Sequence, residues 1–335
     1  MRVAYHMTSI DIQSFLDKQG TFLDVRSPGE YGQGHIPGAI NLPLFSDDER
    51  ALIGATYKKK GHEQAVMLGL EIVGPRISML AAQAKEFVGN NFAKVYCWRG
   101  GMRSSSMNWL LQTAGIKAAT LQGGYKTFRR WALQALTVSR QIILIGGLTG
   151  SGKTEYLHKL KHTGQQILDL EALAKHRGSS YGMIDMQTQP SNEQFENEIA
   201  FCLYNYNSKH PVWIEDESRM IGKCKIPDPL YAQMRTSPLY IMESPHEARV
   251  QQLLQDYGNI SSPTLIAATK RIERKLGSER THQVIFCLQE QNLKGAIEIL
   301  LDYYDKLYSE SLKQRKQQIL YLSNRDNLQN SKAGF

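Results

Sequence analysis

The sequence predicts two α/β domains in tandem, each built on a parallel sheet, with a helical region at the C-terminal end. Its 335 residues exceed one typical domain of about 100–150 residues. Short apolar runs alternate with stretches of helical spacing, the pattern of strand–helix–strand units. The alternation restarts at residue 141 after a segment of mixed composition. We therefore predict domains over residues 1–132 and 139–335.

The first predicted domain contains two strands that end in polar loops. Residues 22–25 form the first strand and run into a Ser-Pro-Gly turn. Residues 81–88 read as helix before the second strand, residues 94–96, and helical spacing resumes over residues 104–113. The second strand therefore ends at Cys97, in a loop that leads into a helix.

The second predicted domain begins with the apolar strand at residues 141–145. Further buried strands are predicted at residues 211–214 and 238–241, and a helix at residues 247–257. Residues 306–335 carry six basic and two acidic residues. Such a basic tail is typical either of a solvated helix with a frayed end or of a nucleic-acid contact.

Composition narrows the class of protein. The 40 Lys and Arg against 32 Asp and Glu leave a formal net charge of +8, which favours an anionic partner such as nucleic acid or a phosphorylated metabolite. The four cysteines lie far apart without a C-x-x-C pair, so neither a zinc knuckle nor a disulfide framework is expected. No stretch approaches the roughly 20 apolar residues of a membrane span. We expect a cytoplasmic protein without a membrane partner.

Cys97 is predicted to be a reactive thiol in an anion-binding loop. The loop leaves a strand and enters a helix, so its backbone N–H groups can curl around an anion beside the thiol. The arginines and the helix N-terminus favour the thiolate, which is the nucleophilic form. A buried structural cysteine is the alternative. The loop residues are Cys97, Trp98, Arg99, Gly100, Gly101, Met102, Arg103 and Ser104.

Residues 24–41 add a family resemblance. They read Asp-Val-Arg-Ser-Pro-Gly-Glu-Tyr-Gly-Gln-Gly-His-Ile-Pro-Gly-Ala-Ile-Asn, and with the cysteine loop they resemble a rhodanese domain over about the first 130 residues. The resemblance implies that Cys97 carries sulfur or selenium. It also implies that Asp24 and Arg26 are structural or charge-setting neighbours of the loop.

The spacing from Cys97 to Arg103 departs from the common rhodanese pattern. It is C-x5-R, one residue longer than the C-x4-R loop of small thiosulfate-type rhodaneses. The wider ring of amides suits a tetrahedral phosphate-like group, and selenophosphate would satisfy it. C-x5-R also resembles the loop of cysteine-dependent phosphatases. A phosphatase is therefore an alternative, although no carboxylic acid for protonating the leaving oxygen is evident beside the loop.

A second anion site is predicted by a match to G-x-x-x-x-G-K-[ST] directly after an apolar strand. Its amides would cradle a diphosphate, Lys153 would neutralise the terminal phosphate, and Thr154 would hold a magnesium ion. The matching residues are Gly147, Leu148, Thr149, Gly150, Ser151, Gly152, Lys153 and Thr154.

The strand at residues 212–214 runs into the acidic stretch 215–217, where a metal-side carboxylate is expected at the carboxyl end of a parallel strand. We favour Asp216 for this role, with Glu215 as the other candidate. An acidic turn without chemistry is the alternative interpretation.

The order of these motifs resembles the bacterial tRNA 2-selenouridine synthase family over nearly the whole chain. The resemblance implies a rhodanese-like domain followed by a P-loop NTPase-like domain. It implies S-geranylation of the wobble 2-thiouridine of tRNA by geranyl diphosphate, then exchange of the geranylthio group for selenium from selenophosphate. The first step would use the phosphate-binding loop, with a magnesium ion as a compatible cofactor.

Cys97 would serve the selenium step, as a covalent carrier or as a thiolate in an amide nest. tRNA and an enzyme that produces selenophosphate are the implied partners. Two alternatives remain: a C-x5-R phosphatase fused to a P-loop kinase, and a non-catalytic nucleotide-binding adaptor with a rhodanese-like module.

Overall fold

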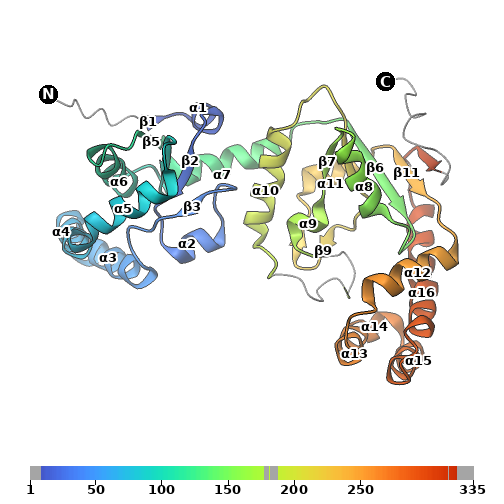
Figure 1. Cartoon of the computed structure of the whole chain (residues 1–335). Helices are drawn as coiled ribbons and strands as arrows, with labels where there is room; N and C mark the ends of the chain where they lie inside the picture. The colour runs from blue at the N-terminus through green and yellow to red at the C-terminus, as the bar shows by residue number, and fades with distance from the viewer. Residues whose placement is uncertain (1–8, 177–180, 182–187, 316, 323–335) are drawn as a thin grey trace. The chain divides into compact units, whose positions relative to one another are not determined.

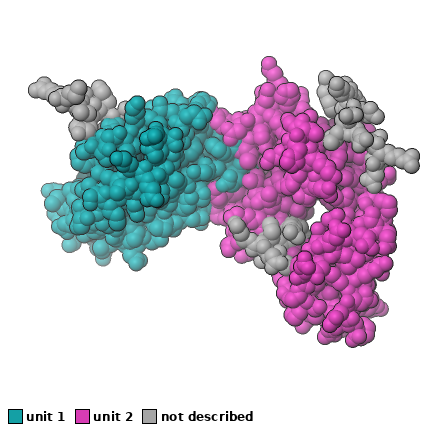
Figure 2. All heavy atoms as spheres, viewed as in Figure 1, with its two compact units in different colours: residues 1–135, 196–201 teal, residues 136–195, 202–335 magenta. Residues whose placement is uncertain are grey.

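The computed structural model describes residues 9–176, 181, 188–315 and 317–322 (Figure 1). The chain forms two compact units (Figure 2): unit 1 comprises residues 1–135 with residues 196–201, and unit 2 comprises residues 136–195 and 202–335. The sequence-based division did not include residues 196–201 in the first unit. Both units carry parallel sheets with helices between the strands, so the predicted α/β class is confirmed.

Unit 1 is built on a five-stranded parallel sheet of order β1-β5-β4-β2-β3. The strands are β1 (Ser9–Ile10), β2 (Thr21–Asp24), β3 (Ile40–Asn41), β4 (Ala93–Tyr96) and β5 (Ala118–Leu121). The helices are α1 (Ile12–Asp17), α2 (Pro28–Gln33), α3 (Asp47–Lys60), α4 (His62–Val73), α5 (Ile77–Val88), α6 (Met102–Thr113) and α7 (Gly124–Ala135), with a short 3-10 helix, η1 (Gly74–Arg76). The strands predicted at residues 22–25 and 94–96 correspond to β2 and β4. Their observed bounds differ from the predicted ones by at most one residue.

The central strand β4 places Cys97 at the edge of the core. All four residues of β4 are buried, as expected for a parallel strand covered on both faces. Its register pairs Leu23 with Val95 and Asp24 with Tyr96, so β2 and β4 end side by side. The loops that follow the two strands therefore meet at the same edge of the sheet.

Helices α3 to α5 form a long helical segment between β3 and β4. Helix α3 starts with a capping box of Ser46 and Glu49 and ends in three lysines, a charge order that complements the helix dipole. The helical run His62–Val88 is 27 residues long and, by length and composition, apolar enough to span a membrane, with 11% of its most apolar window buried. The expectation that no stretch of the chain is long and apolar enough for a membrane span was wrong by this criterion. Length and composition alone are weak evidence for a span.

Unit 2 has a five-stranded parallel sheet of order β12-β11-β6-β8-β7 and a small antiparallel pair, β9 and β10. The strands are β6 (Ile142–Gly147), β7 (Gln166–Leu168), β8 (Val212–Glu215), β9 (Met220–Ile221), β10 (Cys224–Lys225), β11 (Leu239–Met242) and β12 (Ile319–Leu322). The helices are α8 (Lys153–His162), α9 (Leu170–Ala174), α10 (Asn192–Tyr204), α11 (Asp228–Met234), α12 (His246–Tyr257), α13 (Ser262–Arg271), α14 (Glu273–Leu276), α15 (Ser278–Gln289) and α16 (Leu293–Lys313). Strand β6 lies in the middle of the sheet and leads into the predicted phosphate-binding loop.

The chain returns to this sheet after its last helix. Residues 306–313 are helical as predicted, but Ile319–Leu322 forms β12, which pairs in parallel with β11. The prediction of a solvated helix was therefore wrong for β12, because a four-residue apolar run carries no periodicity that separates strand from helix. Residues 323–335 lie outside the described part of the chain.

Candidate functional site

Backbone hydrogen bonds connect the Cys97 loop to the start of helix α7. The N–H of Tyr125 donates to the carbonyl of Cys97 at 2.8 Å, and the N–H of Lys126 donates to that of Trp98 at 3.0 Å. Gly100 adopts φ +65°, and a Cβ there would lie 2.7 Å from a backbone carbonyl oxygen of β5. Only glycine allows this approach, so the loop geometry depends on it.

The thiol of Cys97 contacts a hydroxyl at the start of α6. Cys97 is 3% exposed, and its Sγ lies 3.2 Å from Ser104 Oγ, where either atom can be the donor. Ser104 Oγ also lies 3.0 Å from the carbonyl oxygen of Gly101, which it can donate to. Ser104 has one hydroxyl proton, and a thiolate would draw that proton towards sulfur in a charge-assisted hydrogen bond. Ser104 is therefore placed to stabilise the thiolate form of Cys97.

The two arginines of the loop have different surroundings. Arg103 Nη1 donates to Glu30 Oε2 at 2.6 Å. Burial alone would raise the pKa of Glu30, but the hydrogen bond and charge of Arg103 hold it below its usual range. Arg99 is exposed and makes no ion pair within the described part of the chain. Arg99 is thus the cation of the loop that remains available to an incoming anion.

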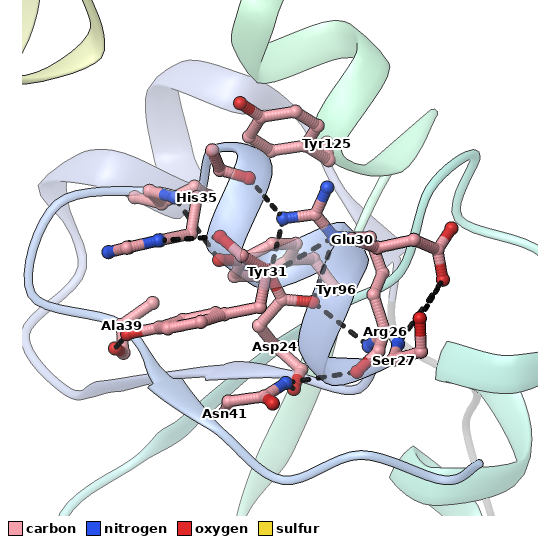
Figure 3. A network of polar contacts seen from close by, with 12 residues as sticks. Asp24, Arg26, Ser27, Glu30, Tyr31, His35, Ala39, Asn41, Tyr96 and Tyr125 are labelled. Atoms are coloured by element: carbon pink, nitrogen blue, oxygen red, sulfur yellow. Dashed lines mark hydrogen bonds and ion pairs between the residues drawn. The ribbon is translucent and has the colours of Figure 1, made fainter. Parts of the chain in front are cut away.

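A buried ion pair, Asp24 with Arg26, lies at the end of β2 (Figure 3). The side chains of Asp24 and Arg26 are 0% exposed, and Arg26 Nε donates to Asp24 at 3.0 Å. The Arg26 guanidinium also donates to the carbonyl of Gly34 at 2.6 Å and lies 3.9 Å from the ring centroid of Tyr125. Further hydrogen bonds offset the burial of such a pair; here they involve Nε and Nη2 of Arg26, whereas Nη1 has no partner among the described residues. The pair therefore supports Tyr125, and through it the Cys97 loop, rather than facing solvent.

In unit 2, the loop after β6 has the shape of a phosphate cradle. Gly150 adopts φ +78°, and a Cβ there would lie 2.9 Å from a carbonyl oxygen of α12. Lys153 Nζ donates to the carbonyls of Gly147 at 3.0 Å and Leu148 at 3.2 Å, so its ammonium curls over the loop. Ser151 Oγ is buried and has no hydrogen-bond partner among the described residues. An ammonium group and a hydroxyl therefore lie at the loop that precedes helix α8, the kind of donors that bind phosphate at a helix N-terminus.

Glu215 and Asp216, the two acidic candidates at the end of β8, have different hydrogen-bond and ion-pair partners. Glu215 is 3% exposed, accepts a hydrogen bond from the Thr154 side chain, and keeps one oxygen without a partner in the described chain. Burial raises its pKa, and the charge of Lys153 opposes that shift. Asp216, which the sequence favoured, is buried in an ion pair with Arg315 at 2.7 Å. The geometry therefore favours Glu215 over Asp216 as the carboxylate beside a metal ion.

Two further carboxyl groups titrate far from their usual range. Burial, with the charges of Glu217 and Glu215, raises the pKa of Glu171 to about 9. Burial, with the charge of Glu215, raises that of Glu217 to about 7. Glu171 is therefore neutral at neutral pH and does not repel an anion in the cradle. In the described ranges, no group of three or more His, Cys, Asp or Glu side chains forms a metal site. The residues present fit a magnesium ion held mainly by phosphate oxygens, with Thr154 and Glu215 beside it.

Side chains from late in the chain also contact the phosphate-binding loop, and no sequence motif indicated them. Arg249 of α12 is 3% exposed, donates to the carbonyl of Thr149 at 3.2 Å and pairs with Asp305 at 2.7 Å. Tyr308 of α16 accepts a hydrogen bond from the N–H of Gly147 at 2.8 Å. These residues lie 100 or more positions from the loop, so no local motif contains them.

An apolar cavity adjoins the cradle. Its volume is about 50 Å³, and it is lined by Thr149 and by apolar side chains of α12, α13, α15 and α16 such as Leu253, Ile297 and Leu301. This volume is well below the roughly 300–1,000 Å³ of small-molecule sites, so the cavity does not hold a hydrocarbon chain as it stands.

Comparison with known proteins covers both units. The family model described as the tRNA 2-selenouridine synthase AAA domain matches residues 140–333, and the rhodanese-like domain model matches residues 10–130. Three relatives carry the name tRNA 2-selenouridine synthase. They come from Marinobacter nauticus (35% identity, 89% of this chain and 90% of that protein), Bdellovibrio bacteriovorus (36%, 90% and 92%) and a Sulfurovum species (34%, 94% and 95%).

Proposed function

The chain belongs to the tRNA 2-selenouridine synthase family, and on that premise we propose that it converts the wobble 2-thiouridine of tRNA into 2-selenouridine in two steps. Each unit carries one anion site, and the two sites differ in chemistry. Unit 2 offers a diphosphate cradle without a thiol, and unit 1 offers a thiol in an amide loop. This difference is the observation that carries the proposal, because alkylation and selenium transfer need these two kinds of site.

The first step is S-geranylation in unit 2. The thiocarbonyl sulfur attacks the first carbon of geranyl diphosphate, the carbon–oxygen bond breaks, and diphosphate leaves with the electron pair while the nucleobase loses its N3 proton. Lys153 and the loop amides oppose the charge on the leaving group. A magnesium ion beside Thr154 and Glu215 would supply further positive charge.

The second step is selenium transfer, which uses the Cys97 loop. Hydrogen selenide ion, released from selenophosphate, adds to carbon 2 of the S-geranylated base. The carbon–sulfur bond then breaks, geranylthiolate leaves with the electron pair and takes up a proton, and the selenium-borne proton moves to N3. Alkylation matters because it converts the sulfur into a leaving group.

Electron balance decides which atom of selenophosphate Cys97 attacks. Attack on selenium would form a sulfur–selenium bond whose selenium needs two more electrons, and so a reductant. Attack on phosphorus needs none: a sulfur–phosphorus bond forms, the phosphorus–selenium bond breaks, and hydrogen selenide ion leaves. Water then hydrolyses the phosphocysteine to phosphate. Arg99 and the N–H groups at the start of α6 would hold the phosphoryl oxygens, which agrees with the C-x5-R spacing.

Two substitutions separate the steps. Cys97→Ser should abolish selenium incorporation and let S-geranyl tRNA accumulate, since alkylation needs no thiolate. Lys153→Ala should suppress geranylation by at least about a hundredfold, because the leaving diphosphate loses its main fixed counter-charge, and pre-geranylated tRNA should restore selenation. Nucleoside mass spectrometry of the tRNA reads both outcomes.

The matched controls are Cys287→Ser, a thiol in α15, and Lys159→Ala, a lysine on the same helix as Lys153 with a side chain 60% exposed. Loss of geranylation in Cys97→Ser, or failure of pre-geranylated tRNA to rescue Lys153→Ala, would contradict the division of labour. Phosphate release from an aryl phosphate without tRNA would instead favour the phosphatase.

A further inference from the structure

An open groove lies beside Cys97 within unit 1, lined by α3, α4 and the Cys97 loop. Its volume is about 1030 Å³, at the upper end of the roughly 300–1,000 Å³ of small-molecule sites. Cys97, Trp98 and Met102 line the end next to the loop. A ligand in this groove therefore has the thiol within its reach.

The lining on the helical side is apolar and open to solvent. Phe45 is buried, Ile53 and Val66 are half-buried, and Tyr57 and Leu70 are 57% and 60% exposed. Exposed hydrocarbon costs about 25 cal/mol per Å² relative to burial. A contiguous apolar surface left open in this way marks a binding site rather than a packing defect.

The rim of the groove is cationic. Lys58 and Lys59 at the end of α3 line it together with Arg99, and these three make no ion pair with any residue that the structure describes. The lysines also complement the α3 dipole, but this does not account for Arg99. A ligand that matches both surfaces has a hydrocarbon part and flanking anionic groups.

We propose that this groove binds the alkylated nucleoside of S-geranyl tRNA, with the geranyl chain on the apolar surface of α3 and α4 and the adjacent phosphates on the cationic rim. This rests on the proposed function. Trp98, 39% exposed beside Cys97, offers a face on which the nucleobase can stack. A membrane surface fits less well, because the groove is concave and contains the thiol loop.

The assignment gives the geranyl chain a second task. Besides making sulfur a leaving group, the chain supplies binding energy remote from the reacting carbon, which holds that carbon near the selenium donor. The selenium step should therefore discriminate between a geranyl and a methyl thioether, although both leave as thiolates.

The test measures binding in the full chain carrying Cys97→Ser, so that no turnover occurs. Fluorescence anisotropy gives the Kd of anticodon stem-loop RNAs with S-geranyl or S-methyl 2-thiouridine. The geranyl RNA should bind at least about tenfold more tightly, and Leu70→Asn should remove about tenfold of that preference, because one lost apolar contact of this size changes affinity by about 10–200-fold. The control Met79→Asn, a 48% exposed methionine of α5 outside the groove, should keep the preference.

Equal affinity for the two RNAs, or an unchanged preference in Leu70→Asn, would overturn the inference. Leu70-dependent binding to phosphatidylglycerol–phosphatidylethanolamine vesicles without any geranyl preference would overturn it too, in favour of a membrane site. Neither result touches the proposed function, which fails separately if the wild-type chain cannot exchange selenium into geranylated RNA.

Discussion

At the scale of single residues, the two sites depend on which of several similar side chains faces the ligand. Cys97 and Lys153 stand in local motifs, so the sequence predicted them. Glu215 and Asp216 are adjacent acids, and neighbouring residues at a strand end point in opposite directions. Only the position of Arg315 shows that Asp216, and not Glu215, forms an ion pair. The ion-pair partner of Asp216 is distant in the sequence, so no motif around Asp216 contains it.

Ser104 provides the residue-scale prediction. In a rapid-quench experiment with selenophosphate, Cys97 of the wild-type chain should gain a phosphoryl group, seen by intact-protein mass spectrometry. Ser104→Ala should slow this gain about tenfold, since a hydrogen bond to a charged group contributes about 1.5–3 kcal/mol. Ser105→Ala, next along α6, is the control. Absence of a phosphoryl-enzyme in the wild-type chain would refute attack on phosphorus, and equal rates in the two variants would refute the role of Ser104.

At the scale of elements, both sites repeat one design, a buried parallel strand followed by a glycine-containing loop and a helix N-terminus. This design is local in sequence, which is why β4 with α6 and β6 with α8 could be predicted. Strand β12 and the groove against α3 and α4 could not, because each depends on a partner distant in the chain. The spacing of apolar residues in α4 is the same as in a buried helix, so the sequence does not show that this face is open to solvent.

The buried acid of α9 gives the element-scale prediction. Folding keeps the pKa of Glu171 at about 9, against about 4.3 in an unfolded chain, so the folded state binds the extra proton between these values. The stability contributed by neutral Glu171 is therefore full below about pH 4.3 and lost as pH rises through about 9. In Glu171→Gln, stability should therefore fall less steeply with rising pH than in the wild-type chain.

Hydrogen exchange of β6 and β8 peptides in the full chain, compared with wild type at each pH from 5 to 9, reads the effect. Glu155→Gln, whose side chain on α8 is 63% exposed, should follow the wild-type curve. A Glu171→Gln curve parallel to wild type would show that Glu171 is not the titrating group.

At the scale of the whole molecule, the net charge of +8 predicts tRNA binding that is mainly electrostatic. Each phosphate contact releases counterions, so log K should fall linearly with log salt concentration. We expect affinity for unmodified tRNA to drop at least about tenfold between 50 and 200 mM salt, measured by anisotropy or filter binding. Replacing Lys58 and Lys59 with Gln should lower the slope. Affinity independent of salt would contradict the prediction. Removing residues 306–335 is an unsuitable probe, because it would also remove β12.

The ion pair of Arg315 with Asp216 and the contact of Tyr308 with the phosphate-binding loop have a consequence for biosynthesis. The ribosome synthesises the phosphate-binding loop more than 150 residues before Arg315, and until then Asp216 lacks its ion-pair partner. Removing one partner of a buried pair typically costs about 3–5 kcal/mol, so a nascent or prematurely terminated chain cannot close this site. Unit 1, by contrast, contains no residue beyond 201. Translation would thus complete the residues around Cys97 first, and only nearly full-length chains would contain every residue that contacts the phosphate-binding loop.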